Sequence, residues 1–444
     1  MRRAFGLPAA TAATAALALL TLGSCATGDR APIARLDATP APRAFDAALV
    51  RRGAELAALG DCRTCHTAPG GRAFAGGLPL ETPFGTIYST NITPDPKTGI
   101  GRWPEEAFRR AMREGVDRGG HHLYPAFPYD RFTLVTDEDD RAIYAYLMTR
   151  PPVESRPPEN RIRFPFNVRA FIGAWKALYF KPGPYRPDPA HDAAWNRGAY
   201  LAEGLGHCSS CHTPRNALGA EREDRHFDGG EAEGWHAYAI NARSNAPVPW
   251  TVDALYAYLR RGWQTEHGVS RGPMAPVTHE LAAARDADVR DLARYVVARM
   301  DGRRGAAAER GAEASGDGSA GARLYAAACV QCHDGARPLP FGGIALSRSI
   351  GVAGENPRNL VNVILYGLPA ADAATAPIMP GYAGAMTDAQ VAELARWMRA
   401  SLTDKPPWEG LDRIVAEARR AGPEVAQAVA GGAGADPARA GESR

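Results

Sequence analysis

Cysteine is scarce in this chain of 444 residues, which contains seven. Six of the seven stand in three copies of one motif, Cys-x-x-Cys-His: CRTCH at 62–66, CSSCH at 208–212 and CVQCH at 329–333. At the cysteine and histidine frequencies of the chain, this motif is expected about 0.003 times by chance. The motif is therefore a repeated unit of the protein rather than a coincidence.

An excess of charge of one sign is also absent. The chain has 52 Lys and Arg against 49 Asp and Glu, a formal net charge of +3 that includes Arg2 and Arg3 near the N-terminus. A chain this close to neutrality gives no sign of a basic binding surface, so we expect no nucleic-acid partner.

Long apolar runs are lacking except near the N-terminus. Residues 1–24 carry a basic start and the run AATAALALLTL, which indicates a signal peptide too short and too rich in Ala and Thr to span a membrane. The ending LGSC resembles the lipobox of bacterial lipoproteins, which implies acylation of Cys25 and attachment to a membrane on the periplasmic side. The alternative is an ordinary cleaved signal peptide in which Cys25 is incidental.

The three motifs favour covalent haem over zinc or a redox-active thiol pair. A zinc site would need two such pairs close together, whereas these lie more than a hundred residues apart. A thioredoxin-like pair needs no histidine and belongs in a βαβ setting, which none of the copies has. In c-type haem attachment every part has a role, because the thiols bind the porphyrin and the histidine ligates the iron. The cofactor-binding residues would be Cys62, Cys65, His66, Cys208, Cys211, His212, Cys329, Cys332 and His333.

The motifs head internal repeats. Each follows a short predicted helix with a glycine, at Gly53, Gly198 and Gly321, which lie 9, 10 and 8 residues before the first cysteine. A second predicted helix closes each repeat, over 136–149, 285–300 and 387–402. Each begins with acidic residues, which we expect to be its N-caps, and each carries aromatic residues on one face. A small residue on one helix and an aromatic on the other would let the two helices cross closely.

This arrangement resembles the small helical cytochrome c fold, which implies an all-α protein of three tandem class I cytochrome c-like domains, each with one covalent haem c. The resemblance also implies a distal methionine ligand before each closing helix, which assigns Met274 and Met379 to the second and third irons. Phe127 takes that place in the first repeat and cannot ligate iron. His121 and His122 lie on the same loop, and we favour His122 as ligand over a structural role for the pair; Met112 and Met148 are expected to be packing residues.

Composition gives the domain boundaries. An aromatic run, VRAFIGAWKALYF at 168–180, is expected to pack against the first two domains rather than to bind a membrane, and strands are expected only as short segments in loops. We predict a signal peptide over 1–24, cytochrome c domains over 46–150, 193–300 and 321–402, a Pro-rich connector over 151–192, a flexible linker over 301–320 and a largely disordered tail over 403–444.

The segments FGTIYSTNITPDPKTGIGRW, LYPAFPY, WNRGAYLAEGLGHCSSCHTPRN and GPMAPV resemble triheme cytochrome c subunits of membrane-associated bacterial dehydrogenases, over residues 46–402. The resemblance implies an electron-transfer protein that links a dehydrogenase to either a quinone or a terminal oxidase. The partner would be a molybdopterin and iron–sulfur enzyme, favoured by Phe127 and the lipobox, or an FAD enzyme. The competing hypothesis is an autonomous, peroxidase-like enzyme with an open first haem.

Overall fold

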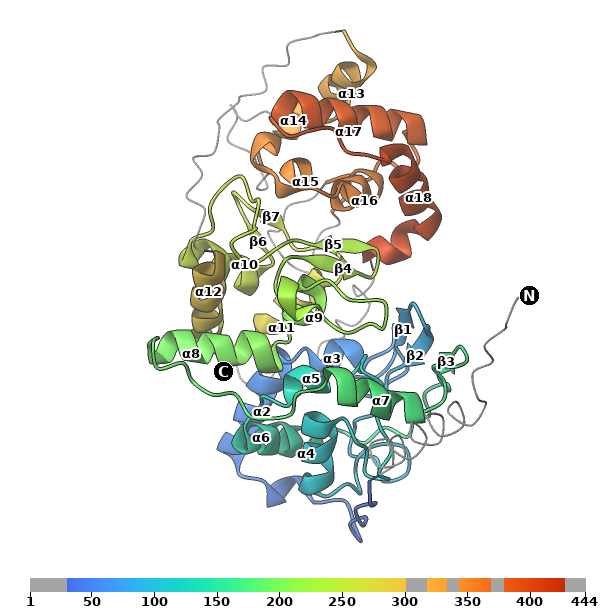
Figure 1. Ribbon diagram of the computed structural model, residues 1–444, viewed down its shortest axis with the longest axis vertical. Helices are drawn as coiled ribbons and strands as arrows, with labels where there is room; N and C mark the ends of the chain where they lie inside the picture. The colour runs from blue at the N-terminus through green and yellow to red at the C-terminus, as the bar shows by residue number, and fades with distance from the viewer. Residues whose placement is uncertain (1–29, 301–317, 334–342, 369–378, 428–444) are drawn as a thin grey trace, which may run out of the picture. The chain divides into compact units, whose positions relative to one another are not determined.

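The computed structural model describes residues 30–300, 318–333, 343–368 and 379–427 (Figure 1). The predicted signal peptide, Cys25 and most of the predicted linker lie outside the described residues. The chain divides into two compact units: the first comprises the chain up to Gly53 and Phe74–Tyr185, and the second comprises Ala54–Ala73 and the chain from Arg186 onward. Within the described part, we find no helix with the length and apolar character needed to cross a membrane.

The first unit combines helices with one small sheet. Its helices are η1 (Pro42–Ala44), the first part of α2 (Ala47–Leu59), α4 (Glu105–Glu114), α5 (Tyr129–Phe132), α6 (Asp137–Met148) and α7 (Ala170–Tyr179). The strands β1 (Pro79–Thr82), β2 (Gly85–Tyr88) and β3 (Arg161–Ile162) form an antiparallel sheet in the order β1-β2-β3. This sheet ties the Pro-rich connector to the predicted first domain.

The second unit contains the end of α2 and all three motif segments. Its first half consists of α3 (Cys62–Cys65), α8 (Ala193–Tyr200) continued by η2 (Leu201–Leu205), α9 (Ser209–His212), η3 (Glu223–Arg225), α10 (Val252–Arg261), α11 (Met274–Leu281), α12 (Asp286–Met300) and the hairpins β4 (Gly230–Ala232) with β5 (Trp235–Ala237) and β6 (Trp263–Gln264) with β7 (Gly268–Val269). Its second half consists of α13 (Ala320–Ala328), α14 (Val330–His333), η4 (Leu346–Arg348), α15 (Ile350–Ala353), α16 (Arg358–Tyr366), α17 (Asp388–Leu402) and α18 (Leu411–Gln427). The described strands have two to four residues, as predicted.

The predicted close helix crossing occurs in all three repeats. A Cβ atom built on Gly53 would lie 1.9 Å from the carbonyl oxygen of Ala142, and one built on Gly198 would lie 2.0 Å from that of Asp291. A Cβ atom on Gly321 would lie 2.4 Å from Cβ of Trp397. Each crossing therefore needs glycine, because the neighbouring atoms belong to backbone or to the root of a side chain.

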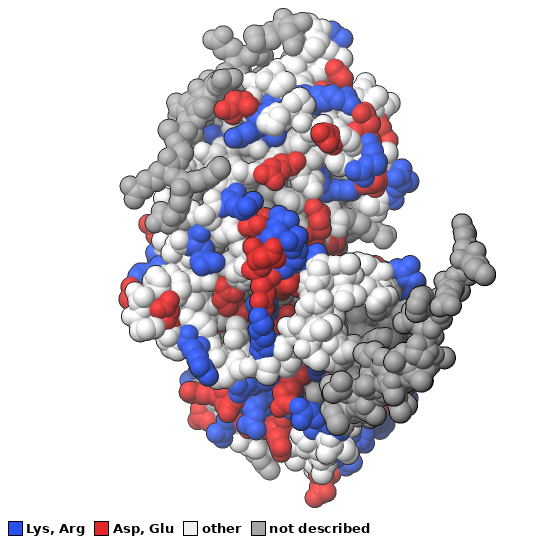
Figure 2. All heavy atoms as spheres, in the orientation of Figure 1, with Lys and Arg blue, Asp and Glu red and all other residues white. Residues whose placement is uncertain are grey.

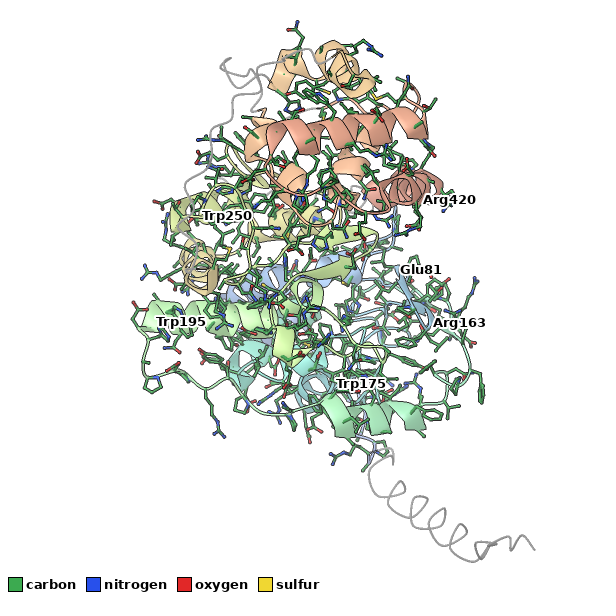
Figure 3. The ribbon with its side chains drawn as sticks, turned by 45° about the horizontal axis from the view of Figure 1, so that its top comes forward. Glu81, Arg163, Trp175, Trp195, Trp250 and Arg420 are labelled. Carbon is green, nitrogen blue, oxygen red and sulfur yellow. The ribbon has the colours of Figure 1, made fainter. Side chains whose placement is uncertain are left out.

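Aromatic side chains of the closing helices cover these crossings. Tyr146 and Tyr295 also meet the sites where a Cβ atom would stand on Gly53 and Gly198. In the second repeat Trp195 of α8 packs edge-on against Tyr295 of α12, with ring centroids 4.9 Å apart; Figure 3 labels Trp195. The prediction of a small residue facing an aromatic one is confirmed.

Two expectations about helix ends need correction. The N-caps of α6 and α17 are Thr136 and Thr387, whose hydroxyls accept from the backbone N–H groups of Asp139 and Gln390. The acidic residues stand in the first turn instead, where the positive end of the helix dipole favours them.

The predicted disordered tail is also partly wrong, because α18 begins at Leu411. Its Leu411, Val415 and Ala418 lie in a core with α16 and α17, and these positions have the spacing of one helix face. Gly422, at φ 78°, and Pro423 break its regular geometry near the end. The sequence carried this signal, but the Ala- and Gly-rich composition around it obscured the period.

The crossing of α13 and α17 can be tested with two glycines of the third repeat. Gly321→Ala should lower the free energy of unfolding by about 1–3 kcal/mol, because the new methyl group overlaps Trp397. Gly384 is exposed, and a Cβ atom there meets nothing within 4 Å, so Gly384→Ala should change stability by less than about 0.5 kcal/mol. Urea unfolding followed by circular dichroism measures both, and equal losses would contradict the proposed crossing.

Candidate haem-attachment sites

Each motif folds as one helical turn directly after the first helix of its repeat. The backbone N–H of the motif histidine donates to the carbonyl of the first cysteine in every copy: His66 to Cys62 at 3.1 Å, His212 to Cys208 at 3.0 Å and His333 to Cys329 at 3.0 Å. Residues three apart in such a turn lie on the same face of the helix. The fold therefore brings together both cysteines of each pair with their histidine.

The two imidazoles of the second and third motifs are oriented for iron ligation. Nδ1 of His212 lies 2.7 Å from the carbonyl oxygen of Tyr238, and Nδ1 of His333 lies 2.9 Å from that of Ile344. A carbonyl only accepts, so Nδ1 carries the proton and Nε2 is left with its lone pair. Burial lowers the pKa of both imidazoles, which favours the neutral form that binds metals.

Five of the six motif thiols have a raised pKa, mainly because they are buried. Burial raises the pKa of Cys62 and Cys208 to about 12 and that of Cys211 and Cys329 to about 11. Reactive or metal-binding cysteines need a lowered pKa. Within the described ranges, no group of three or more His, Cys, Asp or Glu is arranged to hold a metal ion. In the haem hypothesis the sulfurs become thioethers, which carry no titrating proton.

The first motif packs against the second, although they are far apart in sequence. A Cβ atom on Gly60, just before the first motif, would lie 3.0 Å from Cδ1 of Leu205. Nε2 of His207 lies 3.4 Å from the carbonyl oxygen of Gly60. Ala54–Ala73 accordingly belongs to the second unit, so the predicted domain 46–150 is shared between the two units.

Three carboxyl groups that the sequence did not single out lie near the first motif. Asp61 is buried, in left-handed backbone conformation at φ 50°, and accepts a hydrogen bond from Oγ1 of Thr64 at 2.5 Å. Burial, with Glu280 and Glu233 nearby, raises the pKa of Asp61 to about 8. Glu280 also contributes to the raised pKa of Cys62. Only the adjacency of Asp61 to Cys62 is visible in the sequence.

The two predicted methionine ligands lie in different local structures, and the loop of Met379 is tied to the third motif region. Met379 forms a backbone bridge with Leu368, at 2.8 and 3.0 Å, and three residues later the hydroxyl of Tyr382 donates to the carbonyl of Ala328 at 2.9 Å. Ala328 directly precedes the third motif. Met274 begins α11. Iron ligation by Met274 and Met379 stays a prediction.

The two histidines of the first repeat have different surroundings. Nδ1 of the exposed His121 lies 3.1 Å from a carboxylate oxygen of Asp117. His122 is buried, and its Nδ1 lies 3.0 Å from Nζ of Lys176, which also donates to the carbonyls of Glu114 and Gly115. A charged lysine only donates, so Nδ1 of His122 accepts, the reverse of His212 and His333.

Iron ligation by His122 stays a prediction, and it requires a change at the neighbouring Lys176. A ligating Nε2 would place the proton on Nδ1, which must then face an uncharged or displaced Lys176. Burial lowers the pKa of Lys176 to about 8. Met112 and Met148 are buried on α4 and α6, as expected of packing residues, and the ring of Phe127 packs on Phe132 with centroids 5.3 Å apart.

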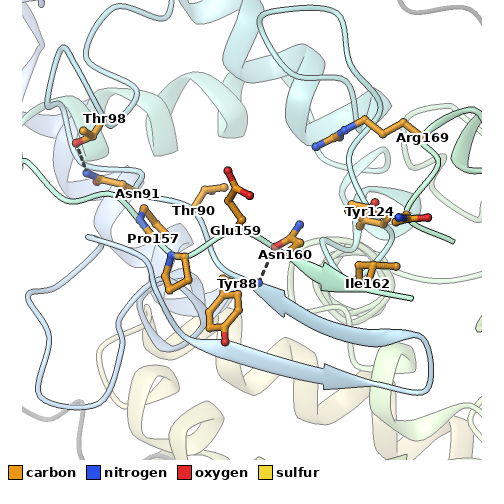
Figure 4. A pocket seen from close by; sticks show the side chains of 12 residues that line it. Tyr88, Thr90, Asn91, Thr98, Tyr124, Pro157, Glu159, Asn160, Ile162 and Arg169 are labelled. Carbon is orange, nitrogen blue, oxygen red and sulfur yellow. Dashed lines mark hydrogen bonds between the residues drawn. The ribbon is translucent and has the colours of Figure 1, made fainter. Parts of the chain in front are cut away.

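An open pocket of about 490 Å³ in the first unit is lined by no motif residue (Figure 4). The side chain of Asn160 accepts from the backbone N–H of Tyr88 at 2.8 Å, and that of Asn91 donates to the carbonyl of Val153 at 2.7 Å. These amides hold the Pro-rich connector against β2 and the loop that follows it. The pocket is the space between the connector and these residues.

The second and third repeats are joined through the hairpin of β4 and β5. The side chain of Asn359 on α16 accepts from the backbone N–H of His236 at 2.9 Å and donates to its carbonyl at 2.8 Å. Asn362 donates to the carbonyl of Gly234 at 3.1 Å. The same hairpin leads into Tyr238, whose carbonyl holds His212, so the contact links the second motif to the third repeat.

The contact can be tested at Asn359. Asn359→Leu leaves both backbone groups of His236 without their partner and should lower the free energy of unfolding of the second unit by about 1–3 kcal/mol. Asn356→Ala, which removes an amide bonded to the exposed carboxylate of Glu231, should cost less. Urea unfolding measures both variants, and an equal or larger effect at Asn356 would contradict the assigned contact.

Comparison with known proteins identifies a cytochrome c domain in this chain. Residues 316–398 match the family model described as cytochrome C oxidase, cbb3-type, subunit III, so the third repeat is a cytochrome c domain, which implies haem c. The chain is 46% identical over 387 residues to a subunit of the nicotinate dehydrogenase of Pseudomonas putida, covering 86% of this chain and 32% of that protein. It therefore spans about a third of that relative's length.

Two relatives match over most of both chains. The gluconate 2-dehydrogenase cytochrome c subunit of Pantoea cypripedii is 37% identical, with 80% of this chain and 86% of that one covered. The fructose dehydrogenase cytochrome subunit of Gluconobacter japonicus is 35% identical, with 81% and 80% covered. The chain belongs to the family of cytochrome c subunits of bacterial dehydrogenases, as the sequence resemblance indicated.

Proposed function

We propose that this chain carries three covalent haem c groups, one on each motif, and conducts electrons from a dehydrogenase catalytic subunit to a quinone or a terminal oxidase. The observation that carries the proposal is the repetition of one geometry: a glycine-mediated helix crossing followed by a one-turn Cys-x-x-Cys-His segment, three times in one chain. When bound, haem c would supply reversible one-electron exchange at iron.

The residues of the chain would hold and tune that group. The six motif cysteines would form the thioether links, and His66, His212 and His333 would bind iron through Nε2. The carbonyls of Tyr238 and Ile344 hold the Nδ1 protons of His212 and His333, which orients these rings and raises their basicity. Met274 and Met379 would be the opposite ligands in the second and third repeats.

The first haem is proposed to have the lowest potential. Ionised Glu233 or Glu280 would place negative charge near this motif, which stabilises oxidised iron. Thioether ligation by Met274 and Met379 would raise the other two potentials relative to ligation by His122. The first motif would then receive electrons, and its packing against the second motif supports direct onward transfer.

We propose a molybdenum hydroxylase with iron–sulfur clusters as partner, with a flavoprotein dehydrogenase as the second candidate. Similarity to the nicotinate dehydrogenase chain and the Phe127 position support the first. Similarity to the gluconate and fructose dehydrogenase cytochromes keeps the second in consideration. The chain would lie on the periplasmic side of a membrane, anchored through lipidated Cys25.

Haem content tests the proposal directly. Mass spectrometry of the mature protein should show three covalent haems, at Cys62 with Cys65, Cys208 with Cys211 and Cys329 with Cys332. Replacing both cysteines of one pair by serine should remove one haem and leave two. Cys25→Ser, the matched control, should leave three because that cysteine stands outside the motifs. Two or fewer covalent haems in the wild-type protein would contradict the proposal.

A further inference from the structure

One short segment of the first unit exposes an unusual amount of apolar surface. Among the described residues, the exposed large apolar side chains are Phe164, Phe166, Val168, Phe171, Leu178 and Leu218. The first five fall within fifteen residues, at β3's exit and along α7, and we call them the α7 patch. Phe164 is 81% exposed and Leu178 69% exposed, whereas apolar residues of this size are usually buried.

The helix α7 buries one face and presents another apolar face outward. Ile172, Gly173 and Lys176 are buried, and Trp175 packs on Tyr129. Phe171 and Leu178, which are seven residues apart and so on one side of the helix, are exposed. The expected packing of this run against the first domain therefore holds for one face of the helix, and its packing against the second domain stays a prediction. The other face is left available.

The charge around the patch is entirely positive in sequence. Between Asn160 and Pro187 the chain has six Lys and Arg and no Asp or Glu. Arg161, Arg163 and Lys181 are exposed. Arg163 and Arg169 donate to the carbonyl oxygens of Pro83 and His122, which hold these side chains without neutralising their charge. Figure 3 labels Arg163, and Figure 2 shows that Lys and Arg stand next to Asp and Glu over much of the visible described surface, unlike in this segment.

Acidic side chains near the described segment include Glu114, which lies near the buried Lys176. Glu159 precedes the segment, and Glu81 on β1 accepts from the hydroxyl of Thr86. Aromatic and Leu side chains rimmed by Lys and Arg are the combination that enters the headgroup region of a bilayer, with the apolar groups among the acyl chains and the cations at anionic headgroups.

The position of the first described residues favours a lipid bilayer, rather than a protein partner, as the ligand of the α7 patch. The backbone N–H groups of Arg30 and Ile33 donate to the carbonyls of Gly120 and Arg118. The same loop is held by α7, through Lys176 to Gly115 and Arg169 to His122. Cys25 stands five residues before Arg30, a reach of at most about 18 Å. A lipid on Cys25, which rests on the proposed function, would hold this side of the unit at a bilayer.

We propose that the α7 patch is a membrane-docking surface that binds bilayers with anionic headgroups. Its apolar side chains enter the interfacial layer while Arg161, Arg163 and Lys181 meet lipid phosphates. The several acyl chains of a bacterial lipoprotein already anchor it firmly, so the patch would add a second contact with the bilayer beside the anchor. The patch would also set the orientation of the first unit on the membrane.

The experiment uses the full-length haem protein with Cys25→Ser, so that lipid modification plays no part. Sedimentation with phosphatidylglycerol-containing vesicles should show binding that weakens with salt and is lost on pure phosphatidylcholine. Phe164→Ser, Phe171→Ser and Leu178→Ser together should weaken binding about tenfold or more, whereas the exposed Leu218→Ser should not. Arg161→Gln with Lys181→Gln should weaken it about tenfold, whereas Arg261→Gln on α10 should not.

Each variant is compared at unchanged circular dichroism and haem spectrum. Absence of binding to anionic vesicles in the Cys25→Ser protein, or equal binding by the triple variant and Leu218→Ser, would overturn the proposal. Loss of co-purification with the dehydrogenase subunit at unchanged vesicle binding would overturn it too, and would assign the patch to a protein partner. The anchor is checked separately, by mass spectrometry of the wild-type N-terminal peptide.

Discussion

The close approach of two helices across a glycine is the constraint on which the rest of the structure depends. At Gly53, Gly198 and Gly321 no Cβ atom fits, because backbone or the root of an aromatic side chain occupies its place. The first helix of each repeat runs directly into the one-turn motif, so the crossing determines where both cysteines and the histidine stand. A packing contact several residues before each motif would therefore determine the position at which the haem is attached.

Contacts between the repeats would join the three proposed haem sites into one path for electrons. The loop at Gly60 packs on Leu205, which brings the first motif to the second. The hairpin that ends at Tyr238 holds His212 through a carbonyl and binds Asn359 of the third repeat through both backbone groups of His236. The hydrogen bonds of this hairpin thus stabilise the contact between the repeats and would also position the second haem ligand, His212.

Much of this could be predicted because the signals are local. Glycine facing an aromatic residue predicted the helix crossings, and the spacing of cysteine and histidine predicted that both cysteines and the histidine of each motif share one helical turn. The helix from Leu411 was missed because an Ala- and Gly-rich composition outweighed its apolar period. Asp61 near Glu280 and His122 bonded to Lys176 could not be foreseen, since each pair joins residues distant in sequence. Contacts of this kind decide potentials and ligation, so those remain the least predictable part.

Potentiometric titration of the variant Cys62→Ser with Cys65→Ser tests the central claim most directly, that three haems form one path beginning at the first motif. The wild type should show three one-electron steps. The variant should lose the step of lowest potential and keep the other two at nearly the wild-type potentials, because the remaining motifs retain their own histidines and carbonyl partners. Loss of the highest step instead, or three steps unchanged, would contradict the account.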